Sequence, residues 1–191
     1  SGEGAIAGAN GRVTYPARFQ LVAAMNPCRC GMAGEPGFRC ARGPRCETDY
    51  RARISGPLLD RIDLRVDVPA VSAADLIAPA RSEPSAAVAR RVALARQIQA
   101  HRYEALGLEG VATNARCPTA LIEEIAAPDR AGAALLRDAS DKLALSARGY
   151  HRLLKVARTL ADLEGAETVG RIHLAEAISW RMAGERVAQA A

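Results

Sequence analysis

The sequence has few aromatic side chains, few lysines, and no apolar run long enough to cross a bilayer. Aromatic residues make up 4% of the 191 residues, so a core must be built from Leu, Ile, Val and Ala. A membrane-spanning helix needs about 20 consecutive apolar residues. The Gly-rich first eleven residues lack the basic flank and apolar stretch of a signal peptide, and they fit either a frayed end or a remnant added for expression. The sequence predicts a globular cytoplasmic protein without a membrane partner.

Several catalytic motifs are also absent. The chain contains no G-x-x-x-x-G-K-[ST] phosphate-binding loop, no G-x-G-x-x-G and no H-E-x-x-H. The three histidines, His101, His151 and His173, form no nucleophilic set with a useful spacing. We expect His151 and the neighbouring Arg152 to be solvated surface groups, and His173 to be a helix cap or a surface residue.

The net charge is +5, and nearly all basic residues are arginine, with only Lys142 and Lys155 as lysines. Arginine is suited to bidentate contacts with phosphate and carboxylate groups. A GC-rich genome that favours Arg and Ala codons explains the same composition equally well. The charge therefore permits a polyanionic partner but does not require one.

The N-terminal third carries the β-like patterns. Residues 12–18 form a short β-like stretch that Pro16 stops, and the apolar run 19–25 predicts a buried strand. A short helix opens near Pro57, and alternating apolar residues over 62–68 predict a half-buried strand. These strands are too few to close a two-layer core, so we expect part of a larger α/β domain.

The rest of the chain is helical in pattern. One helix has Val88, Val92, Ala95 and Ile98 on its apolar face. In another, Ser146 is a good N-cap and Gly165 a plausible C-terminal stop. Helices are predicted over residues 85–103, 118–127, 129–140, 146–165 and 173–183.

Four of the five cysteines lie within a long loop, residues 28–47, with the spacing C-x-C-x9-C-x5-C. Four thiolates suit tetrahedral zinc, and a metal would organise a loop that has no core of its own. The alternative is a reduced loop with incidental thiols. The candidate ligands are Cys28, Cys30, Cys40 and Cys46, whereas Cys117 stands apart and we expect it to be structural.

Three polar residues are candidates for phosphate chemistry. Asn26 follows the apolar run, where open α/β sheets bind ligands, although Asn-Pro also starts turns. Arg61 follows a short helix and could face a γ-phosphate, or form an ion pair with Asp60 or Asp63. Arg148 lies in the first turn of a helix, where the dipole does not favour a cation.

These motifs occur in a specific order: YPARFQLVAAMNPC-x-CG, SGPLLDRIDL, LSARGYHRLLKVARTLADLEG and HLAEAISWR. Together they resemble the magnesium-chelatase-like AAA+ ATPases of the ComM/YifB type, over about residues 12–183. The resemblance implies that Asn26 is the sensor-1 residue, Arg61 the arginine finger and Arg148 the sensor-2 arginine. The four-cysteine loop is similar to an insertion that this family carries after sensor 1.

The implied fold is an α/β fragment plus an all-α part: the C-terminal part of an AAA+ core sheet followed by a helical lid bundle. We expect the core part over residues 1–69 with the Cys-rich insertion, a linker and helix over 70–109, and the lid over 110–191.

The implied function is ATP hydrolysis with Mg²⁺ in a homo-oligomeric, hexameric ring that acts on DNA in branch migration. The phosphate loop of such proteins lies upstream, so we expect this chain alone to bind ATP weakly and to be inactive. The alternatives are a motor subunit for magnesium insertion and a stand-alone zinc-containing binding module. The cysteine loop favours the ComM-like branch over the chelatase proper.

Overall fold

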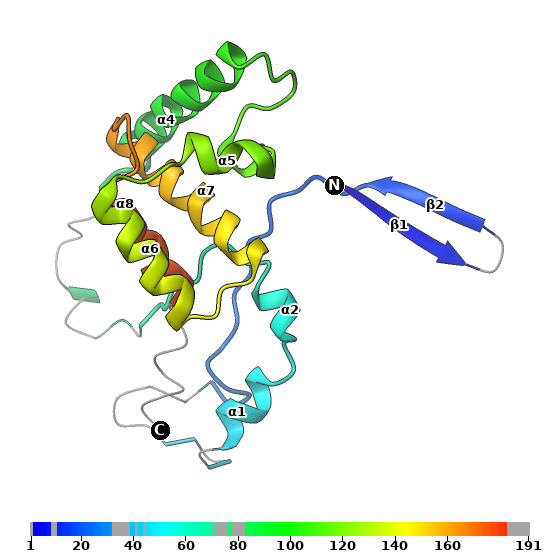
Figure 1. The fold of residues 1–191 in the computed structure, drawn as a ribbon. Coiled ribbons are helices and arrows are strands. Elements are labelled where there is room, and N and C mark those ends of the chain that lie inside the picture. The colour runs from blue at the N-terminus through cyan, green and yellow to red at the C-terminus, as the bar shows by residue number, and fades with distance from the viewer. Residues whose placement is uncertain are drawn as a thin grey trace. The chain divides into compact units, whose positions relative to one another are not determined.

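A computed structural model describes residues 2–8, 11–31, 39–40, 42–43, 45–69, 71, 76–77 and 83–182. The chain divides into two compact units, residues 1–51 and 52–191. Within the described part, a two-stranded sheet and seven α-helices form a mixed, mainly helical fragment (Figure 1). This architecture is consistent with the C-terminal region of an AAA+ protein. The three-part division at residues 69 and 109 remains a prediction.

The first unit begins with an antiparallel hairpin of β1 (Glu3–Gly8) and β2 (Gly11–Pro16). Strand β2 confirms the β-like stretch that Pro16 stops, but residues 3–8 do not form the frayed end that the sequence allowed. Residues 3–8 pair with β2 in register, with Ile6 opposite Val13. Cross-strand pairs of this kind stabilise a hairpin that the glycine content alone does not predict. The unit ends with α1 (Arg45–Arg51).

Two predicted strands are missing from the described structure. Residues 19–25 and 62–68 are not strands. Apart from the half-buried Ile62, their apolar side chains are exposed, up to 85% for Val22 and 86% for Val68. A strand exists only when a neighbouring strand accepts and donates its backbone hydrogen bonds. Among the described residues, no strand pairs with either segment. Both segments have the apolar residues of a strand, but the sequence pattern does not show whether a neighbouring strand is present.

The second unit is a helical bundle around α7, which contacts α4, α5, α8 and η1, while α6 packs on α8 (Figure 1). The predicted helices are confirmed close to their expected positions. The elements are α2 (Gly56–Leu59), α4 (Ser85–Ala105), the 3-10 helix η1 (Asn114–Arg116), α5 (Thr119–Ile125), α6 (Arg130–Lys142), α7 (Ala147–Glu164) and α8 (Arg171–Met182).

Local sequence signals fix the helix ends. Ser146 is the N-cap of α7, and its Oγ accepts a hydrogen bond from the Gly149 N–H at 3.0 Å. Gly165 ends the same helix in the left-handed conformation at φ 71°, which a residue with a Cβ rarely adopts. Asp129 caps α6 in the same way through the Gly132 N–H. Both predictions for α7 are therefore confirmed.

The core of the second unit is mainly aliphatic, with Tyr103 as its fully buried aromatic side chain among the described residues. Cys117 is 2% exposed within this core, which confirms its structural role. The predicted apolar face of α4 was largely wrong, because Val92 is 43% exposed. Of the predicted face only Ala95 is buried, and α4 also buries Gln99 and Tyr103. The Tyr103 hydroxyl donates to the Asn114 Oδ1, and the Gln99 Oε1 accepts from the Asn114 N–H.

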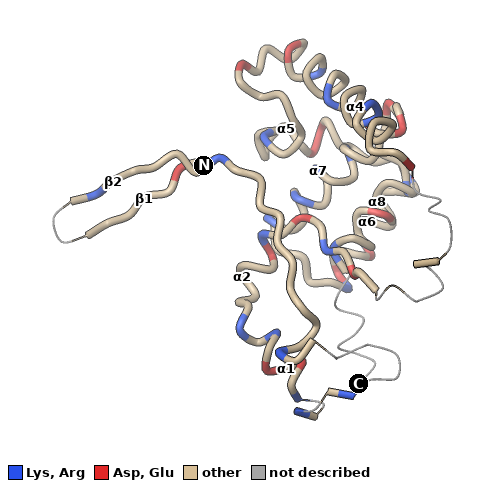
Figure 2. Tube along the Cα trace, turned by 180° about the vertical axis from the view of Figure 1, so that it is seen from behind, with Lys and Arg blue, Asp and Glu red and all other residues tan. Residues whose placement is uncertain are grey.

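Basic and acidic residues are interspersed along the helices of the second unit (Figure 2). Among the described residues, no helix is both long and apolar enough to span a lipid bilayer.

Candidate functional site

The four predicted metal ligands come together in the first unit. The Sγ atoms of Cys28, Cys30, Cys40 and Cys46 all lie within 4.8 Å of one another. Two turns present them, because the Cys28 carbonyl accepts from the Gly31 N–H and the Cys40 carbonyl from the Gly43 N–H, each at 3.0 Å. These four residues are called the Cys cluster below.

The geometry of the Cys cluster fits a tetrahedral cation. With Zn–S bonds of about 2.3 Å, sulfur atoms in a tetrahedral site lie about 3.8 Å apart. The cluster brackets that value, since the Cys30 Sγ is 3.1 Å from two neighbours and no pair exceeds 4.8 Å. The hydrogen bond with Cys30 raises the pKa of Cys40 to about 12. A bound cation would favour the thiolates instead.

Arg61 lies just beyond α2 and is exposed. Its Nη1 donates to the Pro57 carbonyl at 2.7 Å. Arg61 does not form the ion pair with Asp60 or Asp63 that the sequence allowed. Asp60 pairs with Arg181, and Asp63 pairs with Arg152. Within the described part of the chain, the Arg61 guanidinium therefore pairs with no carboxylate and is available at the surface.

Arg148 is the second residue of α7 and is also exposed. One turn later, Arg152 donates to the carbonyl of Arg61 at 2.6 Å. The structure therefore links the two predicted phosphate-binding arginines through the first turns of α7. Their roles as finger and sensor remain predictions.

The expectation that His151 and Arg152 are solvated was wrong. Both side chains are half-buried. His151 contacts the Glu123 carboxylate at 2.9 Å, and Arg152 forms an ion pair with Asp63 and donates a hydrogen bond to the Arg61 carbonyl. His173 is a cap, as predicted, because its Nδ1 accepts from the Gly170 N–H at 2.9 Å. This contact is the N3-to-N-cap half of a capping box.

Asn26 belongs to the first unit, whereas Arg61 and Arg148 belong to the second. Its side chain is exposed, and the segment before it is not a strand. Pro27 and the buried Cys28 follow directly, so Asn26 is adjacent in sequence to the Cys cluster. The sensor-1 role of Asn26 stays a prediction.

The contacts that Asp60 makes with Ser146 and Arg181 were not predicted from the sequence. The Asp60 carboxylate accepts from the Ser146 Oγ at 3.2 Å and pairs with Arg181 at the end of α8. Asp60 and Arg181 are 121 positions apart, so no local pattern indicates their contact. A cavity of about 210 Å³ lies there, lined by Asp60, Arg65, Leu143, Ala144, Leu145, Ser146, Arg181 and Met182.

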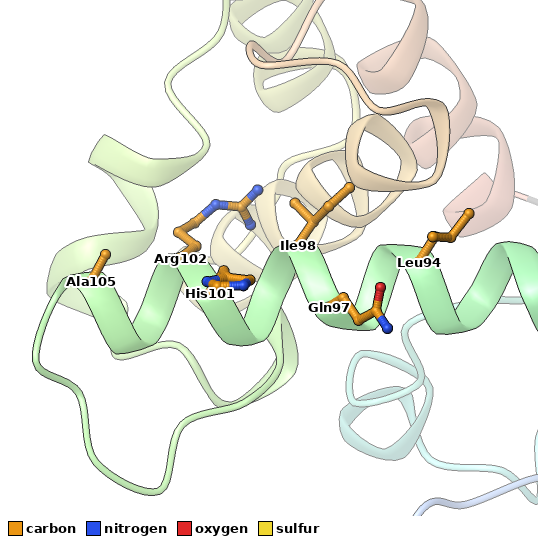
Figure 3. Close-up of a pocket in the computed structure, with 6 residues that line it drawn as sticks. All are labelled: Leu94, Gln97, Ile98, His101, Arg102 and Ala105. Carbon is orange, nitrogen blue, oxygen red and sulfur yellow. The ribbon is translucent and has the colours of Figure 1, made fainter.

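A larger hollow of about 660 Å³ runs along α4 (Figure 3). All of its lining side chains project from that single helix, and none is a predicted site residue. Ligand pockets usually combine polar groups from several elements. The Arg102 guanidinium, moreover, is committed to Asp162. The hollow is therefore an exposed helix face rather than a formed site. Its lining residues are Leu94, Gln97, Ile98, Arg102, His101 and Ala105.

Two family profiles match the chain. The profile described as magnesium chelatase, subunit ChlI C-terminal, matches residues 82–181, which covers α4 to α8. The profile described as magnesium chelatase, subunit ChlI, matches residues 1–76, which includes the Cys cluster and Arg61.

Similar proteins occur in several bacteria. Competence protein ComM of Haemophilus influenzae is 41% identical over 182 residues, which are 95% of this chain and 34% of that protein. An uncharacterized protein of Mycobacterium bovis is 41% identical over 185 residues, 97% of this chain and 36% of that protein. YifB of Escherichia coli is 38% identical over 184 residues, with 95% and 34% covered. The chain thus spans about a third of the length of these relatives.

Proposed function

This chain belongs to the magnesium chelatase ChlI family, with ComM and YifB among its relatives, and from that membership we propose that it is the C-terminal portion of a ComM-like AAA+ ATPase acting on DNA. The family suggests the use of nucleotide and Mg²⁺. The phosphate-binding loop would come from residues outside this chain. In this proposal the chain contributes residues that sense or stabilise nucleotide but do not hold it alone.

The observation that carries the proposal is the availability of Arg61 and Arg148. Both are exposed on the second unit, and Arg152 connects the backbone of Arg61 to the helix that carries Arg148. A guanidinium placed against a γ-phosphate stabilises the charge that develops during phosphoryl transfer. We assign Arg61 as the finger that acts on a neighbouring subunit's nucleotide, and Arg148 as the sensor of the lid.

The other two assignments lie in the first unit. Asn26 would orient the attacking water or a phosphate oxygen through its amide. The Cys cluster would hold zinc in a closed, four-thiolate site. Such a metal supplies a structural cross-link and no open coordination position for chemistry. It would organise residues 28–46, a segment with few aliphatic side chains.

The test is ATP hydrolysis by the full-length protein that carries this chain. Replacing Arg61 with Ala should lower kcat by about 10³-fold or more, because finger arginines contribute effects of that size. Arg61→Lys should restore little, since an ammonium lacks the planar fork. Arg91→Ala is the matched control, because it removes an arginine whose ion pair with Glu83 is exposed. Unchanged kcat in the Arg61→Ala protein would refute the assignment.

Mixing experiments test whether the finger acts between subunits. Subunits with Arg61→Ala and subunits with a disabled phosphate loop should each be inactive alone. Mixed, they should regain part of the activity, because an intact loop of one variant can meet an intact finger of the other. Failure of every mixture to regain activity would argue against a finger supplied by a neighbour.

DNA binding is tested by titrating the full-length protein onto branched DNA at several salt concentrations. A phosphate-reading surface releases counterions, so affinity should fall steeply as salt rises. Binding without salt dependence would count against DNA as the substrate.

The family name also raises magnesium insertion into a porphyrin as a second candidate. We expect no activity in a chelatase reconstitution assay.

A further inference from the structure

The segment of residues 60–65, which carries Arg61, is held on the helical bundle by polar contacts from α7 and α8. These contacts are Ser146 and Arg181 to Asp60, Arg152 to Asp63 and to the Arg61 carbonyl, and the Trp180 carbonyl to the Arg65 N–H. We call this set the Arg61 latch. It brackets Arg61 on both sides in sequence.

Apolar burial holds this segment only in part, because Ile62 is half-buried and Leu64 is 51% exposed. The segment is not a strand, so it has no ladder of backbone hydrogen bonds within the described residues. The N–H groups of Asp60, Arg61 and Ile62 bond to carbonyls of α2, and the latch adds the hydrogen bonds and ion pairs that tie the segment to α7 and α8.

The Asp60–Arg181 contact is the more enclosed of the two ion pairs. The Arg181 side chain is 11% exposed and that of Asp60 is 30% exposed. Ser146, the N-cap of α7, contacts the second carboxylate oxygen at 3.2 Å. The guanidinium thus reaches from the end of α8 across the first turn of α7 to a carboxylate next to Arg61.

Gly149 leaves the space for that crossing. A Cβ at this buried position would lie 2.8 Å from the Arg181 Nη2 and 3.3 Å from its Cζ. Any larger residue would push the guanidinium away from Asp60. The glycine costs some helix propensity in the first turn of α7, and the passage of Arg181 gives a physical reason for its presence.

Arg152 acts on Arg61 more directly. Its Nη1 donates at 2.6 Å to the carbonyl of Arg61 itself and also contacts Asp63, two residues later. At the other end of the segment, the Arg65 N–H donates to the Trp180 carbonyl at 3.0 Å. The peptide that carries the proposed finger is therefore fixed by α7 and the following residues by α8.

We propose that Arg152 and Arg181 are positioning residues for Arg61, and that Gly149 is required for Arg181 to act. This inference rests on the proposed function, in which Arg61 is the finger. A finger stabilises the transition state only when its guanidinium is placed to within about 1 Å. A latch built from the lid helices would transmit the position of the lid to the finger.

The first experiment measures docking of the segment in this chain. Hydrogen exchange of the Arg65 amide reports its bond to the Trp180 carbonyl. In Arg181→Ala, Arg152→Ala and Gly149→Ala, exchange at residues 61–65 should rise about tenfold or more, while amides in the buried turns of α7 keep their protection. Arg91→Ala should change neither. Unaltered exchange at Arg65 in all three variants would overturn the latch.

A double-variant cycle tests the role assigned to Gly149. In the Arg181→Ala background the guanidinium is gone, so Gly149→Ala should add nothing further to exchange at Arg65. If Gly149→Ala raises exchange equally with and without Arg181, its effect arises elsewhere and the assignment fails. Far-UV circular dichroism on each variant identifies any that fail to fold, and Arg181→Lys then replaces Arg181→Ala.

The second experiment measures kcat and KM for ATP in the full-length protein. Loss of Arg152 or Arg181 should lower kcat about 10- to 100-fold with KM nearly unchanged, since a misplaced finger loses transition-state contacts but not ground-state binding. The double variant Asp60→Arg with Arg181→Asp should recover part of the loss.

The outcomes separate the two proposals. If Arg61→Ala itself leaves kcat unchanged, the finger assignment fails and the latch remains only a structural contact. If Arg61→Ala lowers kcat, but the latch variants raise exchange without lowering kcat, the finger stands and the positioning proposal is overturned.

Discussion

Arg158 and Asp162 form an ion pair at 3.0 Å inside the helical unit, one turn apart on α7. Their side chains are 2% and 0% exposed. Arg102 of α4 and Asn114 of η1 also donate to the Asp162 carboxylate, at 3.1 and 2.8 Å. One carboxylate therefore joins α4, η1 and α7, and the polar network lies within the bundle rather than at its surface.

Removing that carboxylate should destabilise the bundle strongly. Asp162→Ala leaves Arg158 buried without its partner, and breaking a buried pair from one side costs about 3–5 kcal/mol. We expect a loss of that order in the free energy of unfolding, measured by urea titration of the far-UV circular dichroism. The matched control, Arg91→Ala, breaks an exposed pair and should cost less than about 1 kcal/mol. Similar losses in the two variants would contradict the assigned importance of the network.

The same carboxylate makes stability depend on pH. Burial alone would raise the pKa of Asp162, but hydrogen bonds from Arg102 and Asn114 and the charge of Arg158 lower it. A carboxyl with a lowered folded pKa contributes fully above its unfolded pKa of about 3.9, and this contribution is lost as pH falls through the folded value. The stability difference between the natural chain and Asp162→Asn should therefore shrink below about pH 4. A difference that is constant from pH 7 down to pH 3 would disprove this linkage.

The cap of α6 provides a local test. The Asp129 carboxylate accepts from the Gly132 N–H at 2.6 Å. Asp129→Ala should lower the free energy of unfolding by about 1 kcal/mol, whereas Asp129→Asn keeps an acceptor and should be nearly neutral. Thermal unfolding of the three proteins compares them directly. An equal loss for Ala and Asn would assign the effect to the carboxylate charge instead of the cap.

The helices were predictable because their signals are local. Ser146 and Gly165 flank one run of apolar residues at helical spacing. Ser146 caps the helix through a hydrogen bond three residues away, and Gly165 ends it by adopting a positive φ angle. The grouping of the Cys cluster was also predictable, because its four members lie within one short segment and four thiolates suit a single tetrahedral ion.

Long-range relationships were not predictable in this way. The runs 19–25 and 62–68 have strand patterns, yet a pattern cannot provide the neighbouring strand. Arginine side chains usually lie at the surface in water, so the sequence does not indicate that Arg152 contacts the Arg61 carbonyl, 91 positions away. Gln99 is a polar residue that α4 buries, and its Oε1 accepts from the N–H of Asn114, 15 positions away. In each case the deciding partner is distant in sequence.

The Cys cluster should bind zinc, with one ion per chain when the protein is purified under reducing, chelator-free conditions. Substitution with Co²⁺ should give the thiolate charge-transfer absorption of a tetrahedral site, because four sulfur atoms lie within 4.8 Å of one another. Cys40→Ser should weaken binding and Cys117→Ser should not, since Cys117 lies in the core of the other unit. Chelation should speed hydrogen exchange over residues 28–46 and leave α7 protected, because the metal would organise only its own loop. A chain purified without metal that also fails to take up Co²⁺ would show that these cysteines are a reduced cluster of thiols, which was the alternative that the sequence left open.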